Sequence, residues 1–374
     1  MRPRMNSRVY IRPIGFAPGP QAEHGNAVRL AGGMVYASRF AVVLRENGAV
    51  TQRWLAAADT ISDVLGRLPD GVGAEAEAQW AALRTAHPPL VLRERTVRLD
   101  QPQVMGILNV TPDRYSDGGR FADIEAPRAE IAAMLEAGAA IIDIGGESTR
   151  PGAKPVWEGD EIARVVPAVS AASAMGAAVS VDTRKPAVME AALDAGAAMV
   201  NDVSGLMHDP RSAEVVAKRG CPVVLMHAPG AGGEDLHAGG DYDNVVLDVF
   251  DHLRSRRDAA LAAGIARENI LLDPGIGFGK TLAASTALVA ALPLFHALGQ
   301  PLLVGSSRKR LIGALSKEAP AEKRLGGSLA LALAAMDAGV QLHRVHDVFE
   351  TVQARNVWRG LRDAALTDFS DLPD

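Results

Sequence analysis

The stretch LEAGAAIIDIGGESTRPG, residues 135–152, joins a helix end to a short apolar run and then to a polar loop. The Ala-Gly pair predicts the end of a helix, because glycine readily takes the positive φ that terminates one. The β-branched run that follows at once predicts a strand. That strand ends in Glu147, Ser148, Thr149 and Arg150, and burying such polar groups at the end of a core strand is costly unless they serve a site.

The same plan of helix end, glycine and strand recurs in LDAGAAMVNDVSG (193–205) and MDAGVQLHRVHDV (336–348). Such units predict parallel βαβ construction, in which helices connect neighbouring parallel strands. Eight strands are predicted from about residue 100 onward, at 104–110, 139–146, 177–183, 197–203, 221–227, 269–275, 301–307 and 340–346. Helical patterns separate them, for example at 128–137, 159–175, 186–195, 243–263 and 322–338.

Eight such units in about 250 residues predict an α/β fold of the (β/α)8 TIM-barrel type. The alternative is an open doubly wound sheet. That fold favours a Gly-rich phosphate-binding motif after its first strand, and the sequence contains none.

The first 87 residues do not share this pattern. Short strands are predicted at 9–16, 27–33 and 38–47, and helices at 55–67 and 74–86. We therefore expect two parts: residues 1–87 as a small α+β extension of unknown role, and residues 88–374 as the barrel. The alternating stretch 90–102 is consistent with a hairpin that closes the bottom of the barrel.

Composition limits the classes of function. The chain has 374 residues, 48% of them hydrophobic, and a formal net charge of −5, so no basic field argues for nucleic acid or a membrane surface. No apolar leader and no membrane-spanning run are evident, and the single cysteine, Cys221, excludes an internal disulfide. We expect a cytoplasmic protein with Cys221 buried as a small apolar residue.

Polar side chains stand at the end of every predicted strand. In a TIM barrel the active site lies at these carboxyl ends, so the residues are expected to share one pocket. Asp182, Asn201 and Asp273 suit a flat heterocycle with several N–H donors. A second, cationic group suits a phosphate-bearing anion and comprises Arg150, Arg308, Lys309, Arg344 and His346. Asn109 at the end of the first strand and Asp113 beyond it could add oxygen ligands for Mg²⁺.

A set of motifs in series resembles the dihydropteroate synthase family. They are GILNVTPDRYSDGG (106–119), DIGGESTRPGA (143–153), SVDTRK (180–185), NDVSG (201–205), LMH (225–227), DPGIGFGKT (273–281), SRK (307–309) and RVHDV (344–348). Each motif alone is a weak signal. Eight in order at barrel spacing, over roughly 95–360, are a strong one.

The resemblance implies a reaction. 6-Hydroxymethyl-7,8-dihydropterin pyrophosphate would condense with p-aminobenzoate, giving 7,8-dihydropteroate and pyrophosphate on the folate pathway. The family's mechanism is SN1-like, with the C–O bond breaking first and Mg²⁺ assisting the departure of pyrophosphate. The aniline nitrogen is a weak nucleophile, so electrostatic stabilisation of the leaving group is expected to supply most of the catalysis.

The resemblance also implies roles for residues. Asp182, Asn201, Asp273 and Lys309 would hold the pterin. Asn109, Arg344 and His346 would hold pyrophosphate, with Asn109 also contacting Mg²⁺. A mobile loop and a pocket wall for p-aminobenzoate would be formed by Thr149, Arg150, Pro151, Phe278 and Lys309, with Ser307 and Arg308 beside them. The family further implies a homodimer formed through the late barrel helices, and sensitivity to sulfonamides.

Three features depart from the family's usual pattern. Arg114 and Tyr115 stand in the first loop where Ser and Phe are common, and Arg310 follows the lysine of the seventh strand where Ser is frequent. Residues 228–240 form an altered, Gly-rich loop after the fifth strand. Two other functions remain open from the sequence: a catalytically silent pterin-binding paralogue, and a methyltetrahydrofolate methyltransferase.

Overall fold

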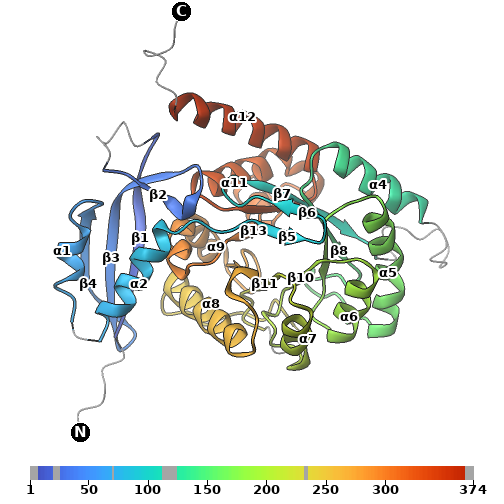
Figure 1. Cartoon of the computed structure of the whole chain (residues 1–374), viewed down its shortest axis with the longest axis horizontal. Helices are drawn as coiled ribbons and strands as arrows, with labels where there is room; N and C mark the ends of the chain where they lie inside the picture. Colours follow the sequence, from blue (N-terminus) through green and yellow to red (C-terminus); the bar gives the residue numbers. More distant parts are fainter. Residues whose placement is uncertain (1–6, 20–25, 70, 112–123, 231–234, 367–374) are drawn as a thin grey trace, which may run out of the picture.

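Eight parallel strands form one sheet that curves into a barrel (Figure 1). The structure is a computed structural model, and it describes residues 7–19, 26–69, 71–111, 124–230 and 235–366. The barrel strands are β7 (Gln103–Asn109), β8 (Ile141–Gly145), β9 (Val179–Asp182), β10 (Met199–Asp202), β11 (Val223–Met226), β12 (Ile270–Asp273), β13 (Leu303–Gly305) and β14 (Leu342–Val345).

The strand order confirms the predicted barrel. Neighbours in the sheet run β12-β11-β10-β9-β8-β7-β14-β13, so successive strands of the chain lie side by side. A parallel backbone bridge between Leu272 and Leu302 joins the two ends of this order. The open doubly wound alternative is therefore excluded.

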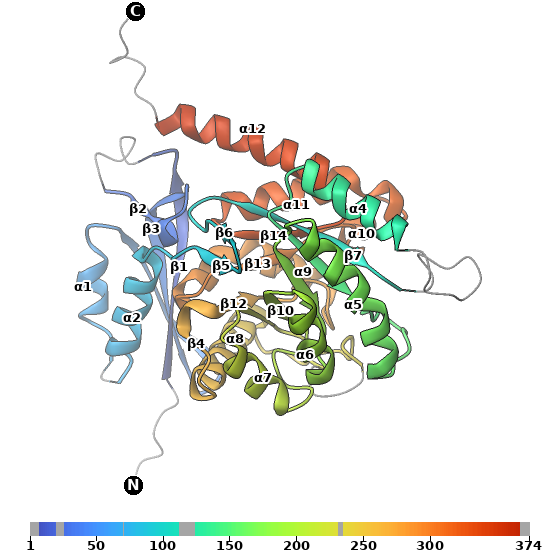
Figure 2. The ribbon, with the colours of Figure 1, turned by 45° about the vertical axis from the view of Figure 1, so that its right-hand side comes forward.

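Helices follow the strands and cover the outside of the barrel in both views (Figures 1 and 2). They are α4 (Glu125–Glu136), α5 (Glu158–Ala174), α6 (Pro186–Ala195), α7 (Arg211–Arg219), α8 (Val245–Ala262), α9 (Leu282–Ala290), α10 (Arg310–Leu315), α11 (Leu325–Asp337) and α12 (Val348–Leu366). Shorter 3-10 segments are η2 (Leu30–Gly32), η3 (Arg267–Asn269), η4 (Leu292–Leu298) and η5 (Ala321–Lys323).

The repeated Ala-Gly motif acts as predicted. Its three glycines, Gly138, Gly196 and Gly339, have φ of 95°, 124° and 82° and stand between a helix and the next barrel strand. The strands that follow are buried almost throughout. Burial on both faces is typical of parallel strands enclosed by helices, because no face of such a sheet meets water.

The N-terminal residues form a separate antiparallel sheet, seen in blue in Figure 1. Strands β1 (Ser7–Ala17), β3 (Tyr36–Glu46) and β2 (Val28–Arg29) lie in that order, and β4 (Ala49–Ala57) pairs with β3. Helices α1 (Ile61–Leu65) and α2 (Gly73–Arg84) follow. The predicted helix at 55–67 was therefore wrong over its first residues, because the pairing of β4 with β3 extends the chain there.

The extension packs on the outside of the barrel beside α8. The Tyr10 hydroxyl donates a hydrogen bond of 2.8 Å to Asp251, and its ring meets Phe250 edge-on at 5.4 Å between centroids. Arg45 of β3 forms an ion pair of 2.5 Å with Asp248. The division into two domains at residue 87 stays a prediction.

A short hairpin closes the bottom of the barrel, as the sequence predicted. Strands β5 (Leu90–Leu92) and β6 (Arg95–Val97) pair antiparallel. Their apolar side chains form one cluster with residues at the amino ends of the barrel strands, among them Met105 and Leu303. The bottom is therefore sealed by apolar packing, and the polar strand ends lie at the opposite mouth.

Two further expectations can be compared with the structure. Among the helices of the described residues, none is both long and apolar enough to cross a membrane. Cys221 is free and buried, as predicted.

Candidate active site

Most of the predicted site residues lie at or beyond the carboxyl ends of the barrel strands. Asn109, Asp182 and Asp273 are the last residues of β7, β9 and β12, and Asn201 lies in β10. Arg344 lies in β14. The fold therefore gathers these side chains at one mouth, which the strand-end rule for this barrel predicts.

Arg344 is the centre of a charged network at this mouth. Its Nε donates to Asp143 Oδ2 at 2.6 Å, and its Nη2 donates to Asp182 Oδ2 at 2.6 Å. The Asn201 side-chain amide donates to the same oxygen of Asp143 at 3.0 Å. Asp143, which had not been predicted as a site residue, thus links Arg344 with Asn201, and Arg344 adds Asp182 to the network.

Asp143 lies in the middle of β8 and is fully buried. A charged residue inside the run IIDIG was a signal in the sequence, because an unpaired charge in a core strand is costly. Its partner could not be identified from the sequence, since Arg344 lies 201 positions away. The two meet because β7, which pairs with both β8 and β14, brings those strands close together.

Burial shifts the pKa values of two groups in opposite directions. It raises the pKa of Asp182 to about 7, with Asp143 adding to the shift and Arg344 opposing it. It lowers the pKa of Lys309 to about 8, where Asp273 opposes the effect and Arg344 adds to it. Between pH values of about 7 and 8, Asp182 is therefore mainly an ionised carboxylate that accepts hydrogen bonds, and Lys309 is mainly a protonated ammonium that donates them.

The loop after β12 holds Asp273 in position. Gly275 N–H donates to Asp273 Oδ1 at 2.7 Å, and burial raises the pKa of this carboxyl. Lys280 at the end of the loop donates to the carbonyls of Gly275 at 2.8 Å and Phe278 at 3.0 Å. Burial lowers the pKa of Lys280 to about 7. These bonds give the loop a fixed shape beside the barrel mouth.

Phe278 and Lys309 are in contact, and their shared role in a pocket wall stays a prediction. The Lys309 ammonium lies 4.5 Å from the centroid of the Phe278 ring, which is cation–π geometry. Lys309 immediately precedes α10.

The loop after β8 is anchored at its base by buried charges. Lys185 donates to Glu147 at 2.9 Å and to Glu161, whose side chain is fully buried, at 2.6 Å. The other carboxylate oxygen of Glu147 accepts from Val156 N–H at 3.1 Å. The Glu147 carboxylate therefore joins the two ends of the loop, at Glu147 and Val156, to Lys185 at the start of α6.

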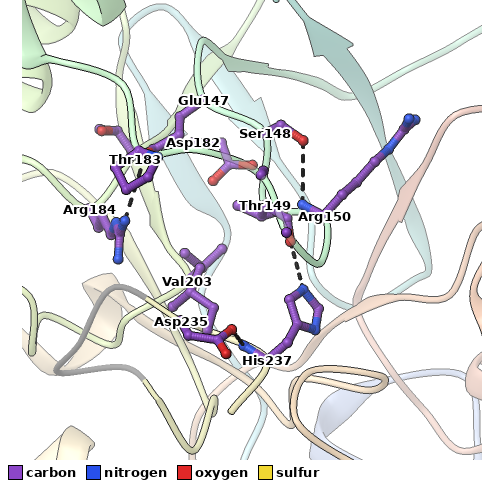
Figure 3. A pocket seen from close by; sticks show the side chains of 14 residues that line it. Glu147, Ser148, Thr149, Arg150, Asp182, Thr183, Arg184, Val203, Asp235 and His237 are labelled. Atoms are coloured by element: carbon purple, nitrogen blue, oxygen red, sulfur yellow. Dashed lines mark hydrogen bonds and ion pairs between the residues drawn. The ribbon is translucent and has the colours of Figure 1, made fainter.

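A cavity of about 240 Å³ opens between this loop and the loop after β11 (Figure 3). Its polar lining includes Thr149, Arg150, Asp182 and Arg184. Asp235 and His237 lie on the opposite side in Figure 3, and Leu236 also lines the cavity. Asp182 thus connects the Arg344 network with the cavity.

His237 is a residue that the sequence did not single out. Its Nε2 lies 2.7 Å from the backbone oxygen of Thr149, and its ring stacks on Phe278 with centroids 5.0 Å apart and planes 14° apart. The unusual composition of residues 228–240 was the only signal, and it did not indicate which residue would point inward.

Other predicted residues lie at the edge of the mouth. The Ser307 hydroxyl and His346 Nδ1 are 3.1 Å apart. The Arg308 guanidinium pairs with Asp347, with Nε at 3.1 Å from the carboxylate. Arg150 and Pro151 are exposed on the loop after β8. The substrate roles of these residues stay predictions.

The residues that depart from the usual family pattern lie in different places. Arg310 is exposed, with Glu318 at 3.9 Å. The first loop, with Asp113, Arg114 and Tyr115, lies outside the described residues.

Comparison with known proteins identifies the family of the chain. A family profile described as pterin binding enzyme matches residues 105–346. The dihydropteroate synthase of Escherichia coli K12 is 45% identical over 260 residues, which are 69% of this chain and 91% of that protein. A probable bifunctional folylpolyglutamate synthase/dihydropteroate synthase of Haloferax volcanii is 47% identical over 264 residues, 71% of this chain, and the match spans 31% of that longer protein.

Solved structures give the same result. A Xanthomonas albilineans dihydropteroate synthase with 4-aminobenzoic acid has a TM-score of 0.69 at 44% identity, covering 77% of this chain and 100% of that one. The same enzyme with 7,8-dihydropteroate has a TM-score of 0.66 at 42% identity, covering 76% and 100%. A Yersinia pestis dihydropteroate synthase with a sulfonamide drug complex has a TM-score of 0.68 at 45% identity, covering 74% and 99%.

Proposed function

The chain belongs to the dihydropteroate synthase family, and from this premise we propose that its barrel condenses 6-hydroxymethyl-7,8-dihydropterin pyrophosphate with p-aminobenzoate. The products are 7,8-dihydropteroate and pyrophosphate. The observation that carries the proposal is the network of Arg344 with Asp143, Asp182 and Asn201 at the mouth of a pterin-family barrel.

The pterin is held by acceptors at the ends of β9, β10 and β12. Asp182 and Asp273 present carboxylate oxygens, and Asn201 presents an amide that can both donate and accept. A pterin ring carries N–H donors along one edge and acceptors elsewhere, which suits this set. Arg344 fixes the orientation of the Asp182 carboxylate through its 2.6 Å bond, and Lys309 completes the site.

Pyrophosphate is held by cationic groups at the same mouth. The bonds of Arg344 to Asp143 and Asp182 use two of its five N–H donors, so further donors are available to an anion. His346 lies beside Ser307, and Asn109 ends β7. These groups stabilise the charge that builds on pyrophosphate as the C–O bond breaks, which is the main requirement of an SN1-like step.

Mg²⁺ fits this donor set as a partly hydrated ion. Within the part of the chain that the structure describes, no cluster of three or more His, Cys, Asp or Glu side chains forms a metal site. Mg²⁺ normally keeps several waters and binds phosphate oxygens together with one or two protein oxygens. Asn109 would be such a ligand, and the ion, when bound, neutralises charge on the pyrophosphate.

p-Aminobenzoate enters from the loop after β8. Thr149, Arg150 and Pro151 lie on that loop, and Phe278 with Lys309 forms the neighbouring wall. No activated nucleophile is needed, because the aniline nitrogen attacks a carbocation that the pterin ring stabilises.

The test is release of pyrophosphate by the purified full-length protein with the pterin pyrophosphate and Mg²⁺. Release that requires p-aminobenzoate and is abolished in Lys309→Ala establishes the synthase. Pterin binding without release would instead indicate a silent pterin-binding paralogue. A methyltetrahydrofolate methyltransferase would release no pyrophosphate, and it would transfer a methyl group from methyltetrahydrofolate.

A homodimer is proposed through the late helices. Leu315 of α10 and Phe349, Val357 and Leu361 of α12 are large apolar side chains that are 60–69% exposed. Such a concentration of exposed apolar residues is typical of an interface. Light scattering after gel filtration tests this, and Phe349→Glu with Leu361→Glu is expected to shift the mass to that of a monomer.

Two further properties are proposed from the relatives and the composition. Sulfonamides compete with p-aminobenzoate, as the drug complex of the Yersinia pestis relative suggests. A cytoplasmic location is consistent with the single, buried, unpaired cysteine.

A further inference from the structure

We propose that His237 is a positioning residue that holds the loop after β8 against the barrel and thereby completes the p-aminobenzoate pocket. The proposal rests on the proposed function for the identity of the ligand. It assigns a role to residues 235–240, the described end of an altered loop that the family resemblance leaves unexplained.

The first observation is the bond between the two loops. His237 Nε2 lies 2.7 Å from the Thr149 backbone oxygen, across 88 positions of sequence (Figure 3). The carbonyl can only accept, so the imidazole donates its Nε2 proton. The base of the loop after β8 is already anchored by Glu147 and Val156. The bond to Thr149 attaches a point nearer the middle of that loop.

The second observation is that His237 itself is firmly placed. The backbone N–H of His237 donates to Asp235 Oδ1 at 2.9 Å, and this bond closes a tight turn. Leu236 beside it is buried in a small apolar cluster with Val203 and Met226. His237 can hold the other loop only if its own position is fixed, because ordering a mobile side chain would cost conformational entropy when the bond to Thr149 forms.

The segment after His237 is fixed as well. Gly240 N–H donates to the Gly279 carbonyl at 3.2 Å. At Gly279, where φ is +56°, an added Cβ would lie 2.4 Å from the Ala238 oxygen. Residues 238–240 therefore lie directly on the backbone of the loop after β12, at a position that requires glycine.

The third observation links His237 to Phe278 and Lys309, the proposed wall of the p-aminobenzoate pocket. The His237 ring stacks on Phe278 at 5.0 Å, and the Lys309 ammonium lies 4.5 Å from the centroid of the same ring. One imidazole thus orders both the loop that carries Thr149 and the aromatic wall beside Lys309. Ordering the pocket before the ligand arrives lowers the entropy cost of binding, so the expected effect falls on substrate affinity.

The test compares two variants that separate the two contacts. His237→Phe retains an aromatic ring for Phe278 and loses the hydrogen bond, whereas His237→Gln retains an N–H donor and loses the ring. The loss of one hydrogen bond predicts that His237→Phe raises the KM for p-aminobenzoate about three- to tenfold with kcat little changed. His237→Gln should restore much of that affinity, and the KM for the pterin substrate should be unaffected in both.

Hydrogen–deuterium exchange gives a readout that does not depend on activity. Amides of residues 147–156 should exchange faster in His237→Phe than in the wild type, while His237→Gln stays close to the wild type. The proposal would be overturned if His237→Phe changed neither the exchange of residues 147–156 nor the KM for p-aminobenzoate. It would also be overturned if the KM values for both substrates rose equally. A wild-type protein without synthase activity would refute the proposed function, and the exchange data would still decide whether His237 holds the loop.

Discussion

The guanidinium of Arg344 lies 2.6 Å from Asp143 and 2.6 Å from Asp182, so one cation is shared by two buried carboxylates at the barrel mouth. Asp143 is fully buried and Asp182 is nearly so. Neither carboxylate could stay charged there without a partner, because the cost of desolvation is large. The network therefore couples the stability of the barrel mouth to the position of Asp182, the carboxylate that we propose binds the pterin.

We expect Arg344→Met to lower the free energy of unfolding by about 3–5 kcal/mol and to abolish activity, because it leaves two buried carboxylates without their cation. Chemical denaturation measures the first effect, and pyrophosphate release measures the second.

The double variant Arg344→Met with Asp143→Asn is the control. It removes one uncompensated charge and should recover part of the stability while activity stays lost. If the double variant were no more stable than Arg344→Met, burial of an unpaired charge would not be the cause.

The pH dependence of kcat/KM should be bell-shaped, since kcat/KM reports groups of the free enzyme. Below a pKa of about 7, Asp182 takes up a proton and loses charge as an acceptor, so the rate falls toward acid. Above a pKa of about 8, Lys309 loses its proton and its charge, so the rate falls toward base. The maximum of kcat/KM is therefore expected between about pH 7 and pH 8.

Lys309→Arg tests whether deprotonation of Lys309 causes the fall of kcat/KM at basic pH. A guanidinium stays protonated across the measurable range, so the residual activity of the variant should not fall above the optimum. A basic limb that is the same in the variant and the wild type would assign it to another group.

Arg45→Met tests the attachment of the N-terminal extension. The Arg45 side chain is 10% exposed, pairs with Asp248 and donates to the Gly48 carbonyl at 2.9 Å. Loss of these charge-assisted bonds should lower the free energy of unfolding by about 1.5–3 kcal/mol, with kcat little changed. Arg53→Met, on the exposed face of β4, is the matched control and should change stability by less than about 0.5 kcal/mol.

Removal of residues 1–86 tests the predicted division at residue 87. Phe250 and Phe295 of the barrel are fully buried, and Tyr10 covers the first of them. Exposing this apolar surface should make the truncated barrel aggregate or melt at a lower temperature, as thermal unfolding and light scattering would show. A truncated protein with unchanged melting temperature and activity would mean that the extension is a separable domain.

The sequence predicted the barrel because its signal is local and repeated. Each unit joins a glycine helix end to a β-branched strand, and the strands appear within two residues of their expected bounds. The prediction was weakest in the extension, where the helix expected from residue 55 begins at Ile61. There the pairing with β3 decided the structure, and such a non-local contact is not visible in a short window of sequence.

What the sequence determined by itself was the fold class, the family and the residue types at each strand end. These follow from periodicity and from motifs that lie along the chain in order. What only the tertiary structure decided was the set of partners: Asp143 with Arg344, and His237 with Thr149 and Phe278. The physical reason is that closing the barrel brings distant segments within hydrogen-bond distance, and those separations depend on strand order and loop path, which no local pattern encodes.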